Sequence, residues 1–132
     1  MLSTKEACVI KRRVLIVDDE TAFLLAIKRL LTGPDISIDT AATLDDAIAL
    51  LHSADFNAVI TDIRLTNVLG MEGLEILRYV KEHSPGTVVV ILTGYGNTGI
   101  METAYNMGAN VYLEKPVPPN ILKNVLENSW RN

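Results

Sequence analysis

Five side chains that could carry out ionic chemistry stand at or just after the ends of apolar segments. Asp18 and Asp19 follow the run Val-Leu-Ile-Val, and Asp62 follows Val-Ile-Thr. Thr93 and Lys115 stand at the ends of two further apolar segments. Three carboxylates, one hydroxyl and one ammonium group, if the fold brings them together, are suited to holding a divalent cation beside a phosphate group.

Each of these residues also has an ordinary structural explanation. An aspartate after a strand is most often a helix N-cap, and a lone threonine or lysine is most often a turn or surface residue. Carboxylates about 4 Å apart, however, repel by roughly 4 kcal/mol per pair at an effective dielectric constant near 20. A fold that gathers them needs a cation or a lysine to offset the charge, so the joint pattern favours a functional site.

The ligand types indicate which cation would bind. Sites made only of oxygen ligands, with few protein groups, suit Mg²⁺, which keeps several waters and shares a phosphate. Neither His52 nor His83, at predicted helix ends, nor the single Cys8 is placed to form a zinc site. The sequence therefore predicts Mg²⁺ as the cofactor.

Alternating hydrophobic periods predict the elements that position these residues. β-Branched segments without a polar face predict buried strands, and apolar residues three or four apart predict helices. The predicted strands are residues 13–17, 36–40, 57–61, 88–92 and 111–113. The predicted helices are residues 21–31, 44–51, 71–81, about 97–107 and 120–130. Thr43 is predicted to cap the second of these helices. The fourth is expected to be short and to end at Gly108.

Five strands alternating with five helices predict an α/β fold with a parallel sheet covered on both faces. Ligands of such sheets bind beyond the carboxyl ends of the strands, where the five side chains stand. In the first helix, an apolar stripe is predicted to face the sheet, opposite Lys28 and Arg29. The stripe consists of Phe23, Leu24, Ile27, Leu30 and Leu31.

Composition sets the class of protein. The 132 residues suit one domain, residues 1–132, with its core at about 13–130. No long apolar run and no N-terminal leader are visible, and a single cysteine fits a reducing compartment, so we expect a cytoplasmic protein without a membrane partner. A net charge of −4 argues against direct nucleic-acid binding by this chain.

Four segments together resemble the receiver domain of two-component response regulators. They are residues 14–20 with the acidic pair, 58–65 with Asp62, 89–94 with Thr93, and 108–116 with Tyr112, Lys115 and Pro116. The resemblance runs from about residue 13 to 130. It implies a flavodoxin-like (CheY-like) three-layer α/β/α sandwich, with a five-stranded parallel sheet in the order 2-1-3-4-5.

The resemblance also implies roles for the site residues. Asp62 would accept a phosphoryl group from the phosphohistidine of a sensor histidine kinase or a phosphotransfer protein. Asp19, Asp62 and the backbone carbonyl of Arg64 would bind Mg²⁺, and Asp18 would act through a water. Lys115 would pair with the phosphoryl oxygens. The chain would be a signalling domain that catalyses its own phosphorylation and dephosphorylation, rather than an ordinary enzyme.

A conformational switch is implied as well. The hydroxyl of Thr93 would move to the phosphoryl group, Tyr112 would turn into the vacated space, and a cis peptide before Pro116 would direct Lys115. These movements would change the face formed by the helix at 97–107, the strand at 111–113 and the helix at 120–130. That face would control a partner or an output domain, or form a homodimer.

The segment after Asp62 departs from the family pattern. Gly73 stands eleven positions after Asp62, where the family has a glycine after eight, and the usual proline is absent. We interpret this as a longer surface loop, since lengthening a loop adds little closure entropy. Arg64 and Tyr95 would flank the path of an attacking water, and their bulk would slow loss of the phosphoryl group.

Two other functions fit parts of the pattern. A haloacid-dehalogenase-like phosphatase also sets Asp, Thr and Lys at strand ends, but it requires Asp-x-Asp, whereas Asp18 and Asp19 are adjacent. A receiver-like binding module without phosphotransfer is the other alternative. The chain would be either a single-domain regulator or the N-terminal receiver of a longer protein, and two segments near Thr93 and Lys115 resemble those of transcriptional activators.

Overall fold

Five parallel strands form one sheet in the computed structural model, which describes residues 11–65, 71–94 and 98–130. The strands are β1 (Arg12–Val17), β2 (Ile36–Ala41), β3 (Ala58–Asp62), β4 (Val88–Thr93) and β5 (Val111–Glu114). They pair in the order β2-β1-β3-β4-β5, which confirms the predicted topology.

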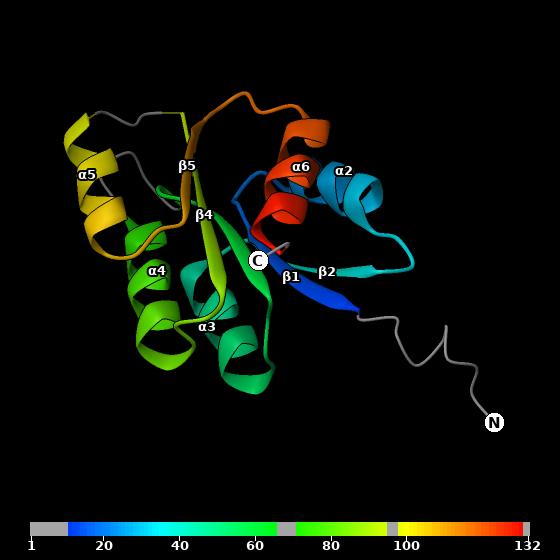
Figure 1. Ribbon diagram of the computed structural model, residues 1–132, viewed down its shortest axis with the longest axis horizontal. Helices are drawn as coiled ribbons and strands as arrows, with labels where there is room; N and C mark the ends of the chain where they lie inside the picture. Colours follow the sequence, from blue (N-terminus) through cyan, green and yellow to red (C-terminus); the bar gives the residue numbers. More distant parts are fainter. Residues whose placement is uncertain (1–10, 66–70, 95–97, 131–132) are drawn as a thin grey trace.

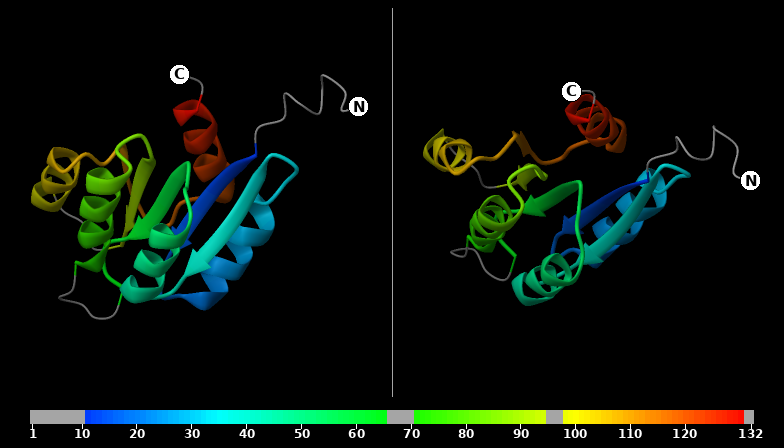
Figure 2. Two further views of the ribbon diagram at one scale, coloured as in Figure 1. Left: turned by 90° about the horizontal axis from the view of Figure 1, so that it is seen from below. Right: turned by 60° about the horizontal axis from the view of Figure 1, so that its bottom comes forward.

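Helices cover both faces of the sheet (Figures 1 and 2). The helices are α2 (Thr21–Leu31), α3 (Leu44–Ser53), α4 (Glu72–His83), α5 (Thr98–Asn106) and α6 (Pro119–Ser129). Helices α2 and α6 lie on one face, and α3, α4 and α5 lie on the other, as expected for a three-layer sandwich. Within the described ranges no helix is long and apolar enough to span a bilayer.

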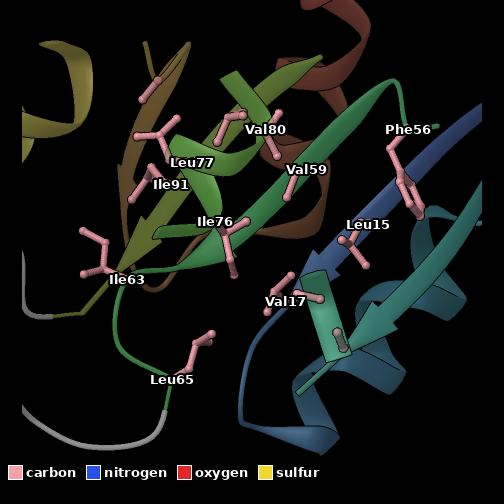
Figure 3. Packing of buried hydrophobic residues seen from close by; sticks show 14 of the residues in the cluster. Leu15, Val17, Phe56, Val59, Ile63, Leu65, Ile76, Leu77, Val80 and Ile91 are labelled. Carbon is pink, nitrogen blue, oxygen red and sulfur yellow. The ribbon is translucent and has the colours of Figure 1, made fainter. Parts of the chain in front are cut away.

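Alternation along the strands divides the core into two clusters. Val14 and Ile16 of β1 pack towards α2 and α6, whereas Leu15 and Val17 pack towards α3 and α4. Figure 3 shows the second cluster, in which Ile76 of α4 lies among strand side chains. Because both faces of the sheet are buried, its inner strands contain almost only apolar residues.

Most element boundaries differ from the predictions by only one or two residues. Asp62 and Thr93 are the last residues of β3 and β4 rather than the first residues beyond them, because Asp62 pairs with Leu92 and Thr93 with Glu114. Helix α5 is the shortest of the described helices, with nine residues, as its glycine predicted. Gly108 ends it with a φ of 105°, a conformation that favours glycine.

Two local predictions on the first two helices had different outcomes. The hydroxyl of Thr43 accepts a hydrogen bond from the backbone of Asp46 at 3.1 Å, which confirms the predicted N-cap of α3. The prediction that Leu30 faces the sheet was wrong, because its side chain is 59% exposed. Leu30 lies on the flank of the stripe that Leu24 and Ile27 turn towards the sheet.

The amino ends of the strands are held by contacts of a different kind. Lys81 Nζ donates to the Thr87 carbonyl at 2.7 Å and to Asn110 Oδ1 at 3.1 Å, and so joins α4 to the segments before β4 and β5. The guanidinium group of Arg12 lies 5.2 Å over the ring of Trp130, which follows α6. Among the described residues, the group of carboxylates that could hold a metal ion lies at the other, carboxyl edge of the sheet.

Candidate functional site

Three carboxylates meet at the carboxyl ends of β1 and β3. One oxygen each from Asp18, Asp19 and Asp62 lies within 4.8 Å of the others. Asp18 is buried with 1% exposure, Asp62 is half-buried and Asp19 is exposed, so the cluster opens to solvent on one side. Oxygen atoms at this spacing, with one open side, can bind a divalent cation that keeps water ligands.

Lys115 supplies the positive charge that offsets the cluster. Its Nζ lies 2.6 Å from Asp18 Oδ2 and 2.9 Å from Asp62 Oδ2. Glu20 Oε1, on an exposed side chain, lies 3.9 Å away. Burial lowers the pKa of Lys115, but hydrogen bonds to Asp18 and Asp62 outweigh that effect and raise the pKa above its usual value. The amine therefore remains an ammonium ion at neutral pH.

Asp18 also holds the short segment that leads into α2. Its Oδ1 accepts a hydrogen bond from the backbone of Glu20 at 2.9 Å, and its own N–H donates to the carbonyl of Ala41 at 3.1 Å. Both oxygens of a buried carboxylate are thus occupied, one by an ammonium group and one by a backbone amide. This pairing explains how a charged side chain is tolerated at 1% exposure.

The carboxylate of Asp62 is held at both oxygens. Oδ1 accepts from the backbone N–H of Arg64 at 3.3 Å, and Oδ2 accepts from Lys115. The next residue, Ile63, donates its N–H to the Leu92 carbonyl at 3.3 Å and so continues the pairing of β3 with β4. The carboxylate therefore has a defined orientation at the sheet edge.

Gly73 lies directly behind Asp62. Its N–H donates to the Ile63 carbonyl at 2.9 Å, and a Cβ at this position would lie 2.1 Å from the carbonyl oxygen of Asp62. Sequence reasoning used Gly73 only to measure the loop and missed this close approach. A glycine in the first turn of a helix, where other residues are favoured, was the available signal.

The two ends of the longer segment after Asp62 are joined to each other. The backbone of Leu65 donates to Glu72 Oε1 at 3.4 Å, next to the bond between Ile63 and Gly73. Residues 66–70 lie outside the described residues, as do Tyr95 and Cys8. The predicted loop and the shielding by Arg64 and Tyr95 therefore stay predictions.

The remaining predicted residues lie on β4, β5 and the turn that follows. Thr93 is 1% exposed, and its carbonyl accepts a hydrogen bond from the Lys115 N–H at 2.9 Å. The peptide between Lys115 and Pro116 is cis, which confirms that expectation. The hydroxyl of Tyr112 is buried and has no hydrogen-bond partner among the described residues, whereas its N–H donates to the Tyr105 hydroxyl at 3.1 Å.

An Asp19→Asn substitution is expected to stabilise the protein in the absence of metal. Burial, followed by the charge of Asp18, raises the pKa of Asp19 above its ordinary value of 3.8, so the folded state disfavours the ionised form. We expect the melting temperature at pH 7 to rise by about 1 to 3 °C. The gain should fade as the pH falls through the raised pKa and vanish below 3.8, where Asp19 is protonated in both states.

The matched control is Asp45→Asn, which neutralises an exposed carboxylate in the first turn of α3. Asp45→Asn should not raise the melting temperature, because the carboxylate of Asp45 interacts favourably with the helix dipole. Thermal unfolding followed by circular dichroism checks both variants. A melting temperature of Asp19→Asn below that of the unsubstituted protein would contradict the prediction.

Sequence relatives share most of this chain. The 34% identical photosynthetic apparatus regulatory protein RegA of Rhodobacter capsulatus matches over 87% of this chain and 61% of its own length. The DNA-binding transcriptional regulator NtrC of Klebsiella pneumoniae is 32% identical over 76% of this chain and 21% of its own length. The chain thus spans less than two thirds of these relatives.

Solved structures agree with the sequence relatives. A response regulator receiver domain protein from Methanospirillum hungatei is 33% identical, with a TM-score of 0.80 over 90% of this chain and 96% of that one. The beryllofluoride-activated NtrC4 receiver domain dimer is 29% identical, with a TM-score of 0.80 over 89% of this chain and 95% of that one. The response regulator receiver domain family matches residues 14–127. This chain, with its acidic cluster at the carboxyl edge of a 2-1-3-4-5 sheet, belongs to the response regulator receiver domain family.

Proposed function

We propose that Asp62 accepts a phosphoryl group from the phosphohistidine of a sensor histidine kinase or a phosphotransfer protein. The observation that carries this proposal is the bridge that Lys115 forms between Asp18 and Asp62, with Asp19 close by. The geometry supplies a nucleophile, a fixed ammonium group and a place for a cation within one cluster. Family membership supports the same role.

The transfer forms one bond and breaks another. A carboxylate oxygen of Asp62 attacks the phosphorus atom as the bond from phosphorus to the imidazole nitrogen breaks, and that nitrogen keeps the electron pair. The donors of Lys115 that now meet Asp62 can then bond to phosphoryl oxygens. Because the protein contributes mainly position and charge, a small change in the cluster geometry should alter the rate strongly.

The residues present fit a bound Mg²⁺. Asp19, Asp62 and the backbone carbonyl of Arg64 would hold it, and Asp18 would act through a water. When bound, Mg²⁺ supplies charge neutralisation at the transferring phosphoryl group. An Asp19→Asn variant should therefore bind Mg²⁺ more weakly than the unsubstituted protein, although it is the more stable of the two without metal.

Phosphorylation would act on the face formed by α5, β5 and α6. The added phosphoryl group brings about −1.5 to −2 charges and three acceptor oxygens, towards which the Thr93 hydroxyl could move. The Tyr112 hydroxyl is already buried in this structure, so we propose that this movement makes the buried position of Tyr112 more stable. A partner, an output domain or a second copy of the chain would then bind the altered face. The similar beryllofluoride-activated NtrC4 receiver domain is a dimer.

Opposite effects on stability are expected from removing the hydroxyls of Tyr112 and Tyr105. A buried hydroxyl without a partner costs about 1–3 kcal/mol, so Tyr112→Phe should raise the free energy of unfolding by about 1 kcal/mol. Tyr105→Phe should lower it by about 0.5 kcal/mol, because the N–H of Tyr112 loses its acceptor. Urea unfolding measures both, and a destabilised Tyr112→Phe variant would show that its hydroxyl has a partner.

Phosphate uptake from acetyl phosphate tests the proposed function. The protein, incubated with acetyl phosphate and Mg²⁺, should gain the mass of one phosphoryl group, and hydroxylamine should remove it, as expected for an acyl phosphate. Chelation of Mg²⁺ should suppress the gain. A protein that remains unmodified with Mg²⁺ present would instead support a receiver-like binding module without phosphotransfer.

The receiver domain is proposed to act within a larger regulatory system. RegA and NtrC are regulatory proteins longer than this chain, and NtrC is described as a DNA-binding transcriptional regulator. By analogy, we infer that the receiver controls transcription through a partner or an attached output domain, in the cytoplasm. Direct DNA binding by the receiver itself does not fit its net charge of −4.

A further inference from the structure

Lys115 has an aromatic neighbour in addition to its carboxylate partners. Its Nζ lies 5.2 Å from the centre of the Phe23 ring, within the range of a cation–π contact. We propose that Phe23 is a positioning residue, whose ring holds the Lys115 ammonium group beside the phosphoacceptor. This inference rests on the proposed function of Asp62, because it assigns a further residue to the same reaction.

The ammonium group has a competing position that the ring opposes. Lysine is a flexible point charge with four rotatable bonds, unlike the planar and preorganised arginine. Glu20, whose side chain is 71% exposed, lies 3.9 Å from Nζ and could draw it outwards. Phe23 is half-buried and packs against the core cluster of α2 and α6, so its ring is a fixed surface that favours the inward position.

The contact of Lys115 with Phe23 can persist through the reaction, whereas its contact with Asp62 must change. Phosphoryl transfer changes the carboxylate of Asp62 into an acyl phosphate, and its bond to Lys115 must then rearrange. Asp18 and Phe23 take no part in bond formation. Lys115 can therefore keep its contacts with both of them before and after transfer.

The fold couples Phe23 to the acidic cluster through the start of α2. Phe23 stands in the first turn of this helix, and the backbone of Glu20, just before the helix, donates to Asp18 Oδ1 at 2.9 Å. The ring and the buried carboxylate are thus held on one short segment. Phe23 also lines an apolar groove together with Lys115 and Leu30, so the ring and the lysine side chain share one surface.

Three substitutions distinguish an effect of the aromatic face of Phe23 from an effect of its apolar packing. Phe23→Leu keeps apolar bulk but removes the aromatic face, and Phe23→Tyr keeps the face. Leu30→Ala alters the same groove at an aliphatic residue, which offers Lys115 no aromatic face. Phosphorylation by acetyl phosphate with Mg²⁺ is measured for each, and NMR of the metal-free protein records the ε-methylene proton shifts of Lys115, which respond to the ring current of Phe23.

Phe23→Leu should slow phosphorylation about two- to fivefold and abolish the ring-current shift of Lys115. Phe23→Tyr should keep both the phosphorylation rate and the ring-current shift of the unsubstituted protein. Leu30→Ala should change neither. In a Lys115→Met background, Phe23→Leu should have no further effect on the rate. Three results would overturn the proposal. Phe23→Leu could leave the phosphorylation rate unchanged, or it could slow phosphorylation equally with and without Lys115→Met. The third is a chemical shift of Lys115 that is the same with and without the ring.

The two measurements also keep this inference apart from the proposed function. Unsubstituted protein that takes up no phosphate would contradict the phosphoacceptor role of Asp62. The NMR shift, which needs neither metal nor phosphate, would still decide whether Phe23 holds the ammonium group of Lys115.

Discussion

An Asp62→Asn variant is expected to take up no phosphoryl group from acetyl phosphate with Mg²⁺ present. The amide oxygen is a far weaker nucleophile than a carboxylate, and the substitution also removes one of the three negative groups of the cluster. We expect uptake to fall by at least about a hundredfold, since no other residue should carry an acyl phosphate. Mass spectrometry of the intact protein, before and after hydroxylamine, measures the loss.

The fold of this variant should be retained. The side-chain amide keeps an oxygen that can accept the Arg64 N–H, and Lys115 keeps its 2.6 Å bond to Asp18. Asp45→Asn, on the exposed surface of α3, is the matched control and should take up phosphate normally. A hydroxylamine-labile phosphate on Asp62→Asn would show that the acceptor is misassigned.

Replacement of Lys115 by methionine is expected to have the largest effect on stability. The substitution keeps most of the side-chain volume but removes the ammonium group that, among residues 11–65, 71–94 and 98–130, lies within ion-pair distance of Asp18 and Asp62. Asp18 would then hold a buried charge supported by one backbone N–H. We expect a loss of about 2–4 kcal/mol in metal-free protein, below the upper range for buried pairs because Lys115 is 20% exposed.

Mg²⁺ should restore much of that stability. A divalent cation at the three carboxylates would replace the missing ammonium charge, and ligand binding to the folded state stabilises it by mass action. Magnesium affinity, measured by calorimetry, should also increase, because Lys115 no longer competes for the same oxygens. Phosphorylation by acetyl phosphate should nevertheless slow, since the phosphoryl oxygens lose a donor.

The stabilisation by Lys115 should depend on pH, and a second lysine variant serves as its control. The raised pKa of Lys115 means that its contribution is complete below the ordinary lysine value of 10.5 and is lost as the pH rises through the folded-state pKa. Lys81→Met removes a lysine bound to carbonyl and amide oxygens at the opposite edge of the sheet. It should destabilise without rescue by Mg²⁺. Equal rescue of both variants would contradict the predicted role of Lys115.

The parallel sheet, with Asp18, Asp62 and Lys115 along one of its edges, could be predicted from the sequence pattern, whereas the strand order followed from the resemblance to the receiver family. Apolar strands alternating with amphipathic helices leave few topologies, and in a parallel sheet all carboxyl ends lie on one edge. Residues at those ends therefore share one edge, and the long side chain of Lys115, after β5, reaches Asp18, after β1, across the ends of β3 and β4. The position of Tyr112 on β5 followed from the same periodicity, but the burial of its hydroxyl did not.

Contacts between side chains distant in sequence could not be predicted. The close approach of Gly73 to Asp62 depends on where α4 begins after the longer segment, and no local pattern fixes that point. The contact of Phe23 with Lys115 depends on how α2 lies across the sheet. Leu30 was misassigned because a helical stripe indicates which residues are apolar, whereas neighbouring elements decide how far round the helix burial extends.

The position of Trp130 has a practical consequence for all of these experiments. It is the single tryptophan of the chain, and it lies under Arg12 at the amino edge of the sheet, away from the acidic cluster. Its fluorescence should therefore report the contact between α6 and β1, with no direct contact between the indole ring and the groups that change charge at Asp62. Emission spectra can thus monitor integrity of the fold while an independent assay follows occupancy of the acceptor in the same sample.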